Sequence, residues 1–117
     1  MFVGAPLLRP FPAPHSPSAV QVLPAAPGFG LGAAHPNLYG DLSDFTAHHA
    51  LARDPEYGPK FLTEFQDRLL FGTDLCAPDM PLPLVDLLRE WRDRGKISPE
   101  VFRKVARENA VRLFGLA

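Results

Sequence analysis

The stretch most suggestive of chemistry is RLLFGTDLCAPDMP, residues 68–81, in which an apolar run ends at Asp74 and a proline-bounded loop follows. The contiguous apolar residues before Asp74 are typical of a strand that is covered on both faces. A carboxylate directly after such a strand lies at the rim where α/β sheets and barrels place catalytic groups. The same position also suits a turn aspartate whose side chain bonds the backbone two residues on. Asp74 is the leading candidate for a catalytic residue.

Other reactive residue types occur in weaker patterns. Cys76 could act as a ligand or nucleophile, but no histidine is paired with it in the sequence, so we expect a small buried residue. Asp41 and Ser43 follow an earlier apolar segment, where they could line a pocket or form a turn. His48 and His49 come next, in a loop or at a helix start. Adjacent residues on a helix point about 100° apart, so the two histidines cannot easily share one metal ion. At most one of them would approach the site, and we expect surface positions.

Strands alternating with helices are predicted to position these residues. The pattern predicts strands over residues 37–43 and 68–74. Between them, residues 53–68 predict a helix with Asp54 as its N-cap, interrupted by Gly58 and Pro59. Apolar residues at helical spacing predict a further helix in 81–95, and Ser98 is predicted to cap a last one. The expected buried residues of these two helices are Leu84, Leu87, Leu88, Trp91, Phe102, Val105, Ala106, Ala110 and Leu113. This order implies a parallel sheet with its chemistry at the carboxyl ends of the strands.

The first 36 residues differ from the rest of the chain. They hold eight of the 14 prolines and Arg9 as their single charged residue, without any acid. Repeated prolines predict an irregular tail over 1–36, followed by an α/β domain over 37–117. The glycines of PGFGLGAA lack the GxGxxG spacing of a dinucleotide site. His15 lies in this tail, and His35 just before the first strand is expected to be a solvated loop residue.

Composition excludes several classes of function. The chain has 117 residues, with 12 basic and 13 acidic side chains and a net charge of −1, so no overall field would gather nucleic acid or anionic lipid. A single cysteine excludes a disulfide framework, and no apolar run reaches the roughly 20 residues that a membrane span needs. We therefore expect a soluble cytoplasmic protein. Its length is that of one modest domain, well short of the roughly 250 residues of an eight-stranded α/β barrel.

Three segments together resemble the C-terminal end of the metal-dependent amidohydrolase superfamily, in the branch that also includes decarboxylases. They are HPNLYGDLS, FLTEFQDRLLFGTDLCAPDMPLPLVDLL and ISPEVFRKVARENAVRLFGL, which cover residues 35–116 in this order. The resemblance implies an α/β fold that corresponds to about the last two strand–helix units and the terminal helix of a TIM (β/α)8 barrel. RLLFGTD resembles the eighth strand of that barrel, and ENAVRLFGL resembles its closing helix.

The resemblance also implies a role for Asp74. It matches the aspartate that in this family binds a catalytic divalent metal, most often zinc, and handles the proton of the attacking water. The family takes its other ligands from a His-x-His pair and from histidines on middle strands, and this sequence contains no His-x-His. The metal is therefore not expected to bind to this chain alone.

Two interpretations stay open. In the first, the chain is a truncated or split hydrolase or decarboxylase for a small organic substrate, inactive until a complementing chain or a homo-oligomer completes it. In the second, it is a non-catalytic interaction module whose strand edges and apolar helix faces dock onto a partner.

Overall fold

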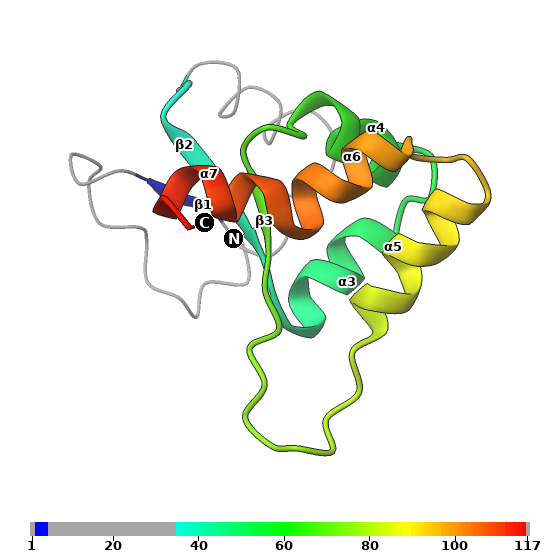
Figure 1. Ribbon diagram of the computed structural model, residues 1–117. Helices are drawn as coiled ribbons and strands as arrows, with labels where there is room; N and C mark the ends of the chain where they lie inside the picture. The colour runs from blue at the N-terminus through cyan, green and yellow to red at the C-terminus, as the bar shows by residue number, and fades with distance from the viewer. Residues whose placement is uncertain (1, 5–34, 117) are drawn as a thin grey trace.

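The computed structural model describes residues 2–4 and 35–116, which form a mixed α/β structure built on one small sheet (Figure 1). The strand order is β1-β2-β3, with bounds β1 Phe2–Gly4, β2 Leu38–Leu42 and β3 Leu69–Phe71. β2 and β3 run parallel, as the strand–helix alternation predicted, whereas β1 pairs with β2 in the antiparallel sense.

β1 lies within the segment that was predicted to be an irregular tail. Its register places Gly4 opposite Leu38 and Phe2 opposite Gly40, so the first residues of the chain add a strand to the sheet. The prediction did not include this strand, because three residues are too few to show an alternation. Residues 5–34, where the rest of that prediction falls, are outside the described part of the chain, as is His15.

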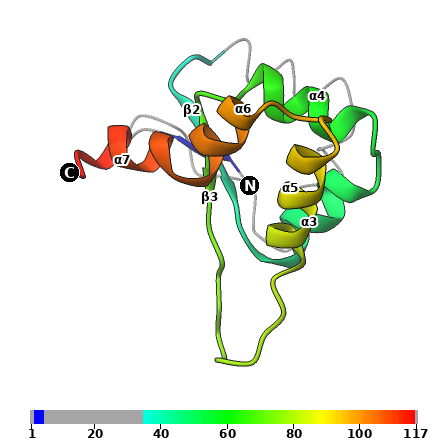
Figure 2. The same cartoon turned by 45° about the vertical axis from the view of Figure 1, so that its right-hand side comes forward.

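The helices occupy the connections after β2 and after β3. Their bounds are α3 Asp44–Ala52, α4 Tyr57–Glu64, α5 Pro83–Asp93, α6 Pro99–Arg103, the π-helical turn η1 Lys104–Glu108, and α7 Asn109–Phe114. Figures 1 and 2 show α3, α4 and α5 together on one side of the sheet. They share one core with the inner residues of the strands, made of Leu42, Leu51, Phe61, Leu62, Phe65, Leu69, Leu84, Leu88, Trp91, Ile97, Val101 and Val105.

Two helical predictions need correction between β2 and β3. Residues 44–52 form α3, which buries only Ala47 and Leu51 and so offers little apolar periodicity to detect. Gly58 and Pro59 were expected to interrupt the next helix, but both lie inside α4 and are buried. Proline is tolerated there because the amides of the first helical turn have no intrahelical acceptor. The N-cap of α4 is Glu56, not Asp54 as predicted, but Oδ1 of Asp54 accepts hydrogen bonds from the backbone amides at positions 56 and 57, at 3.1 and 2.9 Å, in the turn before the helix.

The closing helix, made of α6, η1 and α7, buries only part of the predicted face. Ser98 caps it as expected, with its Oγ accepting the amide of Val101 at 3.1 Å. Its fully buried residues are Val101, Val105 and Asn109, of which only Val105 was predicted. Among the other predicted residues, Phe102 packs partly buried against the core, Ala106 and Ala110 are half-buried, and Leu113 is exposed. The π turn in η1 explains the difference, because it holds nearly one residue more than an α turn and keeps residues spaced by four on one side.

Asn109 is a fully buried polar residue that ties the closing helix to β3. Its Nδ2 donates to the backbone carbonyls of Gln66 and Leu69, the latter at 2.8 Å, and Arg112 donates to its Oδ1 at 3.3 Å. A buried amide with its groups bonded is stable, whereas an unbonded one is costly. The sequence prediction gave Asn109 no structural role.

Over residues 2–4 and 35–116, no helix is long and apolar enough to cross a membrane.

Candidate functional site

The carboxyl ends of β2 and β3 form a common rim. Leu42 pairs with Phe71, and the amide of Gly72 donates to the carbonyl of Leu42 at 3.1 Å as the last bond between the strands. Ser43 and Asp44 follow β2, while Gly72, Thr73 and Asp74 follow β3. The carboxyl ends of the two strands therefore lie next to each other in the structure.

Gly72 permits a close approach at this rim. A Cβ at this position would lie 3.0 Å from the Cβ of Ser43 and 3.1 Å from Oδ1 of Asp41. These distances are shorter than ordinary van der Waals contacts, so a larger residue would push the two strand ends apart. Asp41 and Ser43, proposed from the sequence as pocket or turn residues, thus pack against β3 and do not reach into the open space beside it.

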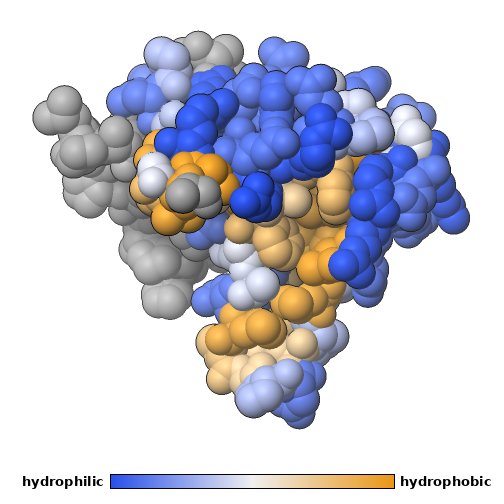
Figure 3. Space-filling model, viewed as in Figure 1, coloured by the Kyte–Doolittle hydropathy of each residue, from blue (hydrophilic) through white to orange (hydrophobic). Residues whose placement is uncertain are grey.

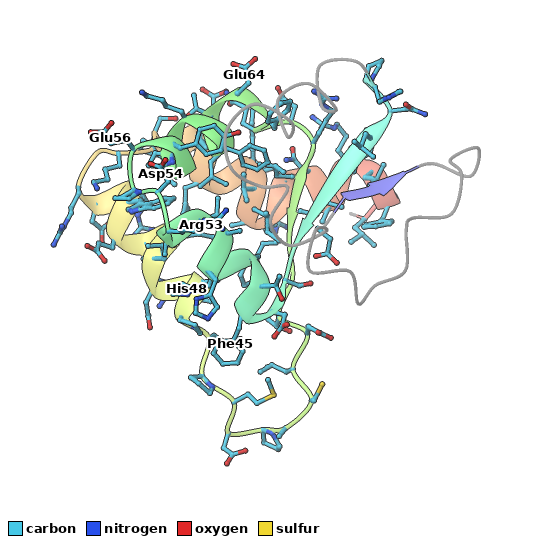
Figure 4. All side chains as sticks on the ribbon, turned by 180° about the vertical axis from the view of Figure 1, so that it is seen from behind. Phe45, His48, Arg53, Asp54, Glu56 and Glu64 are labelled. Atoms are coloured by element: carbon cyan, nitrogen blue, oxygen red, sulfur yellow. The ribbon has the colours of Figure 1, made fainter. Side chains whose placement is uncertain are left out.

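A shallow depression lies beside the rim, between the ends of the strands and the start of α5. Its empty volume is about 280 Å3, open to solvent, and its lining is mostly apolar. The lining residues are Asp44, Phe45, Phe71, Gly72, Thr73, Met80, Pro81, Leu82, Pro83, Leu84 and Val85. Figure 4 shows Phe45 directed from α3 toward the long loop that follows β3.

Two aspartates at the rim have left-handed backbone conformations. Asp44 has φ 62° and Asp74 has φ 50°, and they are the positive-φ residues other than glycine in the described chain. Such conformations are costly for residues with a side chain and often occur at functional sites. Asp44 accepts a hydrogen bond from Oγ1 of Thr46 at 3.1 Å, whereas the Asp74 side chain is exposed to solvent. Asp74 borders the depression without lining it.

Cys76 is exposed, which corrects the prediction of a small buried residue. Its amide donates to Sδ of Met80 at 3.3 Å, and its Sγ donates to the backbone carbonyl of Asp74 at 3.6 Å. The loop after β3 extends away from the helices, as Figure 2 shows, so the thiol has no core to enter.

The histidines do not converge on the rim. His35 is exposed before β2, as predicted, and its carbonyl accepts a hydrogen bond from Arg68. His48 is half-buried and His49 is exposed on α3, with their ring centroids 5.6 Å apart, and neither lines the depression. Among the residues that the structure describes, no three His, Cys, Asp or Glu side chains are grouped closely enough to hold a metal ion.

Sequence reasoning missed two residues of the site, Asp44 and Phe45. The signal for Asp44 was present, because it follows an apolar strand just as Asp74 does. Phe45 gave no signal, since its place over the loop depends on α3, a helix that was not predicted.

Comparison with known proteins adds one match. The family model described as Amidohydrolase matches residues 26–116. No curated protein and no solved structure matches the chain.

Proposed function

Because the chain belongs to the amidohydrolase family, we propose that it takes part in the hydrolysis or decarboxylation of a small organic substrate at the rim of β2 and β3. The observation that carries the proposal is the position of Asp74. It lies three residues after the end of β3, in a left-handed conformation, beside an apolar depression. Family membership supports a hydrolase-type function in general. The polar residues at the carboxyl ends of β2 and β3 support that rim as the place where the reaction occurs.

We assign Asp74 the handling of a proton. In hydrolysis, its carboxylate accepts a proton from a water molecule as the water oxygen attacks the substrate carbon, and it then returns the proton to the leaving group. The exposed position of Asp74 allows water to reach it. The apolar side chains of Phe45, Phe71 and Met80 would contact the substrate from one side.

We place β2 and β3 as the last two strands of a TIM barrel. Their parallel pairing, the helices that connect them and the polar residues at their carboxyl ends all agree with that architecture. In such barrels the catalytic residues come from the ends of several strands, so two strands supply only part of a site.

Amidohydrolases generally use divalent metals, and the described residues do not fit one by themselves. Asp74 offers one carboxylate, and His48 and His49 on α3 do not line the depression. A catalytic zinc needs about three protein ligands. The other ligands have to come from outside the described residues, for example from a complementing chain.

Complementation tests this proposal. The chain is co-expressed with the upstream six strand–helix units of a complete amidohydrolase, and zinc binding and hydrolysis are measured for the wild type, Asp74→Asn and Asp79→Asn. Asp79 is an exposed acid on the same loop and serves as the matched control. We expect wild type and Asp79→Asn to gain zinc binding and activity, and Asp74→Asn to lose about 100-fold or more in rate.

Equal activity of Asp74→Asn and wild type would refute the role of Asp74. A folded complex without zinc binding or activity would favour the other interpretation, a non-catalytic interaction module.

A further inference from the structure

β2 has two edges, and its backbone groups are divided between them. On the edge toward β3, the amide of Gly40 donates to the carbonyl of Arg68 at 2.8 Å. The carbonyl of Leu42 accepts the amide of Gly72 on the same edge, at 3.1 Å. Because backbone groups alternate in direction along a strand, the amide and carbonyl of Tyr39 point to the opposite edge, here called the outer edge of β2. Figures 1 and 4 show β1 lying along this outer edge, in agreement with the strand order β1-β2-β3.

The central residue of β1 takes the hydrogen-bonding groups of Tyr39. The register places Val3 opposite Tyr39 in an antiparallel pair. Since Tyr39 directs both its amide and its carbonyl toward β1, the two residues form the closed pair of an antiparallel ladder, in which each amide donates to the other carbonyl. β1 therefore occupies the groups that any other neighbour of β2 would need on this edge.

β1 differs from β2 and β3 in two respects. It runs antiparallel to β2, whereas the strands of a TIM barrel are all parallel. It also lies outside residues 26–116, the part of the chain that matches the amidohydrolase family model and contains both other strands. In the barrel arrangement proposed above, the outer edge of β2 is the place of the preceding barrel strand. β1 thus holds the position of a barrel strand without being one.

The outer side of the closing helix offers a partner no comparable place. It carries exposed charged residues, namely Glu100, Arg103, Arg107 and Glu108. Figure 3 shows hydrophilic residues over α6 on this face of the molecule. Helices form the outer ring of a TIM barrel, so a polar outer side is expected of them. A complementing chain would therefore meet this chain through its sheet.

We propose that β1 is a replaceable strand, which covers the outer edge of β2 until a complementing chain displaces it with a parallel strand. This inference rests on the proposed function, because it takes β2 and β3 as the last two strands of a barrel. One edge has one set of backbone groups, so β1 and a barrel strand cannot both pair with Tyr39. β1 competes with the complementing chain and, in its absence, keeps unrelated strands from the edge.

The pairing of β1 is short, which suits it to displacement. β1 has three residues, whereas β2 offers the five residues Leu38–Leu42 to an incoming strand. Gly4 and Gly40 both lie in the paired segment, and glycine weakens a strand. The pairing also has to close residues 5–37, a far longer connection than the two to five residues or so of a usual hairpin, and the entropy cost of closure grows with length.

The competition sets the size of the expected effect. Three cross-strand residue pairs change an equilibrium constant by about threefold to 100-fold. A partner that binds only when the edge is open has its apparent Kd raised by the same factor, because only the open fraction of the chain is able to bind. Release of β1 should therefore tighten binding of the complementing chain by about threefold to 100-fold.

A binding titration tests the proposal. The probe is the upstream six strand–helix units of a complete amidohydrolase, and its Kd is measured by biolayer interferometry with the full chain immobilised. Val3→Pro removes the amide that Tyr39 accepts, so it should bind the probe about threefold to 100-fold more tightly than wild type. Gly4→Pro is the matched control, because the amide of Gly4 points away from β2, and its Kd should stay within about twofold of wild type.

Hydrogen exchange of the Tyr39 amide shows whether β1 has left the edge. In the chain without the probe, this amide should exchange at least about tenfold faster in Val3→Pro than in wild type or Gly4→Pro. A variant that lacks residues 1–4 contains no new proline and should match Val3→Pro in both measurements. Circular dichroism checks that each variant is folded.

Equal affinities of wild type, Val3→Pro and the shortened variant overturn the proposal. So does a Tyr39 amide that exchanges freely in wild type, since β1 then leaves the edge open. Absence of binding by every variant also overturns it, because the outer edge is then not the docking place.

Binding is measured separately from activity, so the proposed function and the role of β1 can fail independently. Val3→Pro should tighten binding equally when Asp74 is replaced by asparagine. Tighter binding of Val3→Pro together with an inactive wild-type complex would contradict the proposed function and retain the role of β1. An active complex whose Kd does not depend on β1 would do the reverse.

Discussion

Replacing Asn109 by alanine tests whether one buried amide holds the closing helix to β3. The substitution removes both donors of Nδ2 and leaves the carbonyls of Gln66 and Leu69 without them. The side chain is fully buried, so water does not replace the lost bonds. Each net hydrogen bond is worth about 1 kcal/mol, and each carbonyl left unbonded costs a further 1 kcal/mol or so. We expect a loss of about 2–4 kcal/mol, against roughly 5–15 kcal/mol for a whole domain.

Urea unfolding followed by circular dichroism measures this loss. With a slope of about 2 kcal/mol/M, the midpoint should fall by about 1–2 M. Arg103→Ala is the matched control on the same helix. Its guanidinium forms an ion pair with Glu108 at 3.3 Å between two exposed side chains, so the cost should stay below about 1 kcal/mol.

Asn109→Asp separates hydrogen bonding from side-chain shape. The carboxylate keeps the size of the amide but brings oxygen against two carbonyl oxygens, and burial would raise the pKa of the new acid. A raised pKa in the folded state means that the native protein binds the proton more tightly. The stability of this variant should therefore rise as pH falls through that pKa. If the free energy of unfolding of Asn109→Ala lies within about 0.5 kcal/mol of the wild-type value, Asn109 does not hold the closing helix to β3 in the way argued.

Two further predictions concern the core and an ion-pair cluster. Gly58→Ala should destabilise the fold by about 1–3 kcal/mol in the same urea assay, because a Cβ there would lie 2.5 Å from the Trp91 ring; an unchanged midpoint would show that the ring can move aside. Hydrogen bonds that the Lys104 ammonium donates to the carboxylates of Asp67 and Glu100 raise the pKa of Lys104 above its ordinary 10.5. A raised pKa in the folded state means that charged Lys104 stabilises the fold at neutral pH and that this stabilisation is lost as the pH rises through the pKa. The difference in free energy of unfolding between wild type and Lys104→Met should therefore shrink in strongly alkaline buffer.

The sequence predicted the elements with strong periodicity or clear caps. β2, β3 and α5 appeared where expected, and Ser98 caps the closing helix through its Oγ. Each has a local cause, whether an apolar run, a helical stripe or a capping side chain, and such causes are visible in a few adjacent residues.

The missed features depend on contacts between distant residues. α3 has almost no apolar stripe of its own and depends on its packing beside α5. The face of the closing helix depends on a π turn, for which the sequence gives no signal. Cys76 is exposed because its loop extends into solvent, although its residue type is usually buried.

The candidate site was predicted only in part, for the same reason. Asp74 could be selected because a strand followed by an acid is a local pattern. The depression beside it could not, since its lining comes from the start of α3, the end of β3 and the start of α5.

The bond between Asn109 and Gln66 also has a consequence for synthesis on the ribosome. Asn109 is 43 residues later in the chain than the carbonyl that it binds. At about 5–20 residues per second, the ribosome needs roughly 2–9 s to add these residues. During that interval the emerging β3 has its strand neighbours but not its side-chain cap. The nascent protein therefore passes through a period in which the carbonyls of Gln66 and Leu69 lack the donor that binds them in the folded protein.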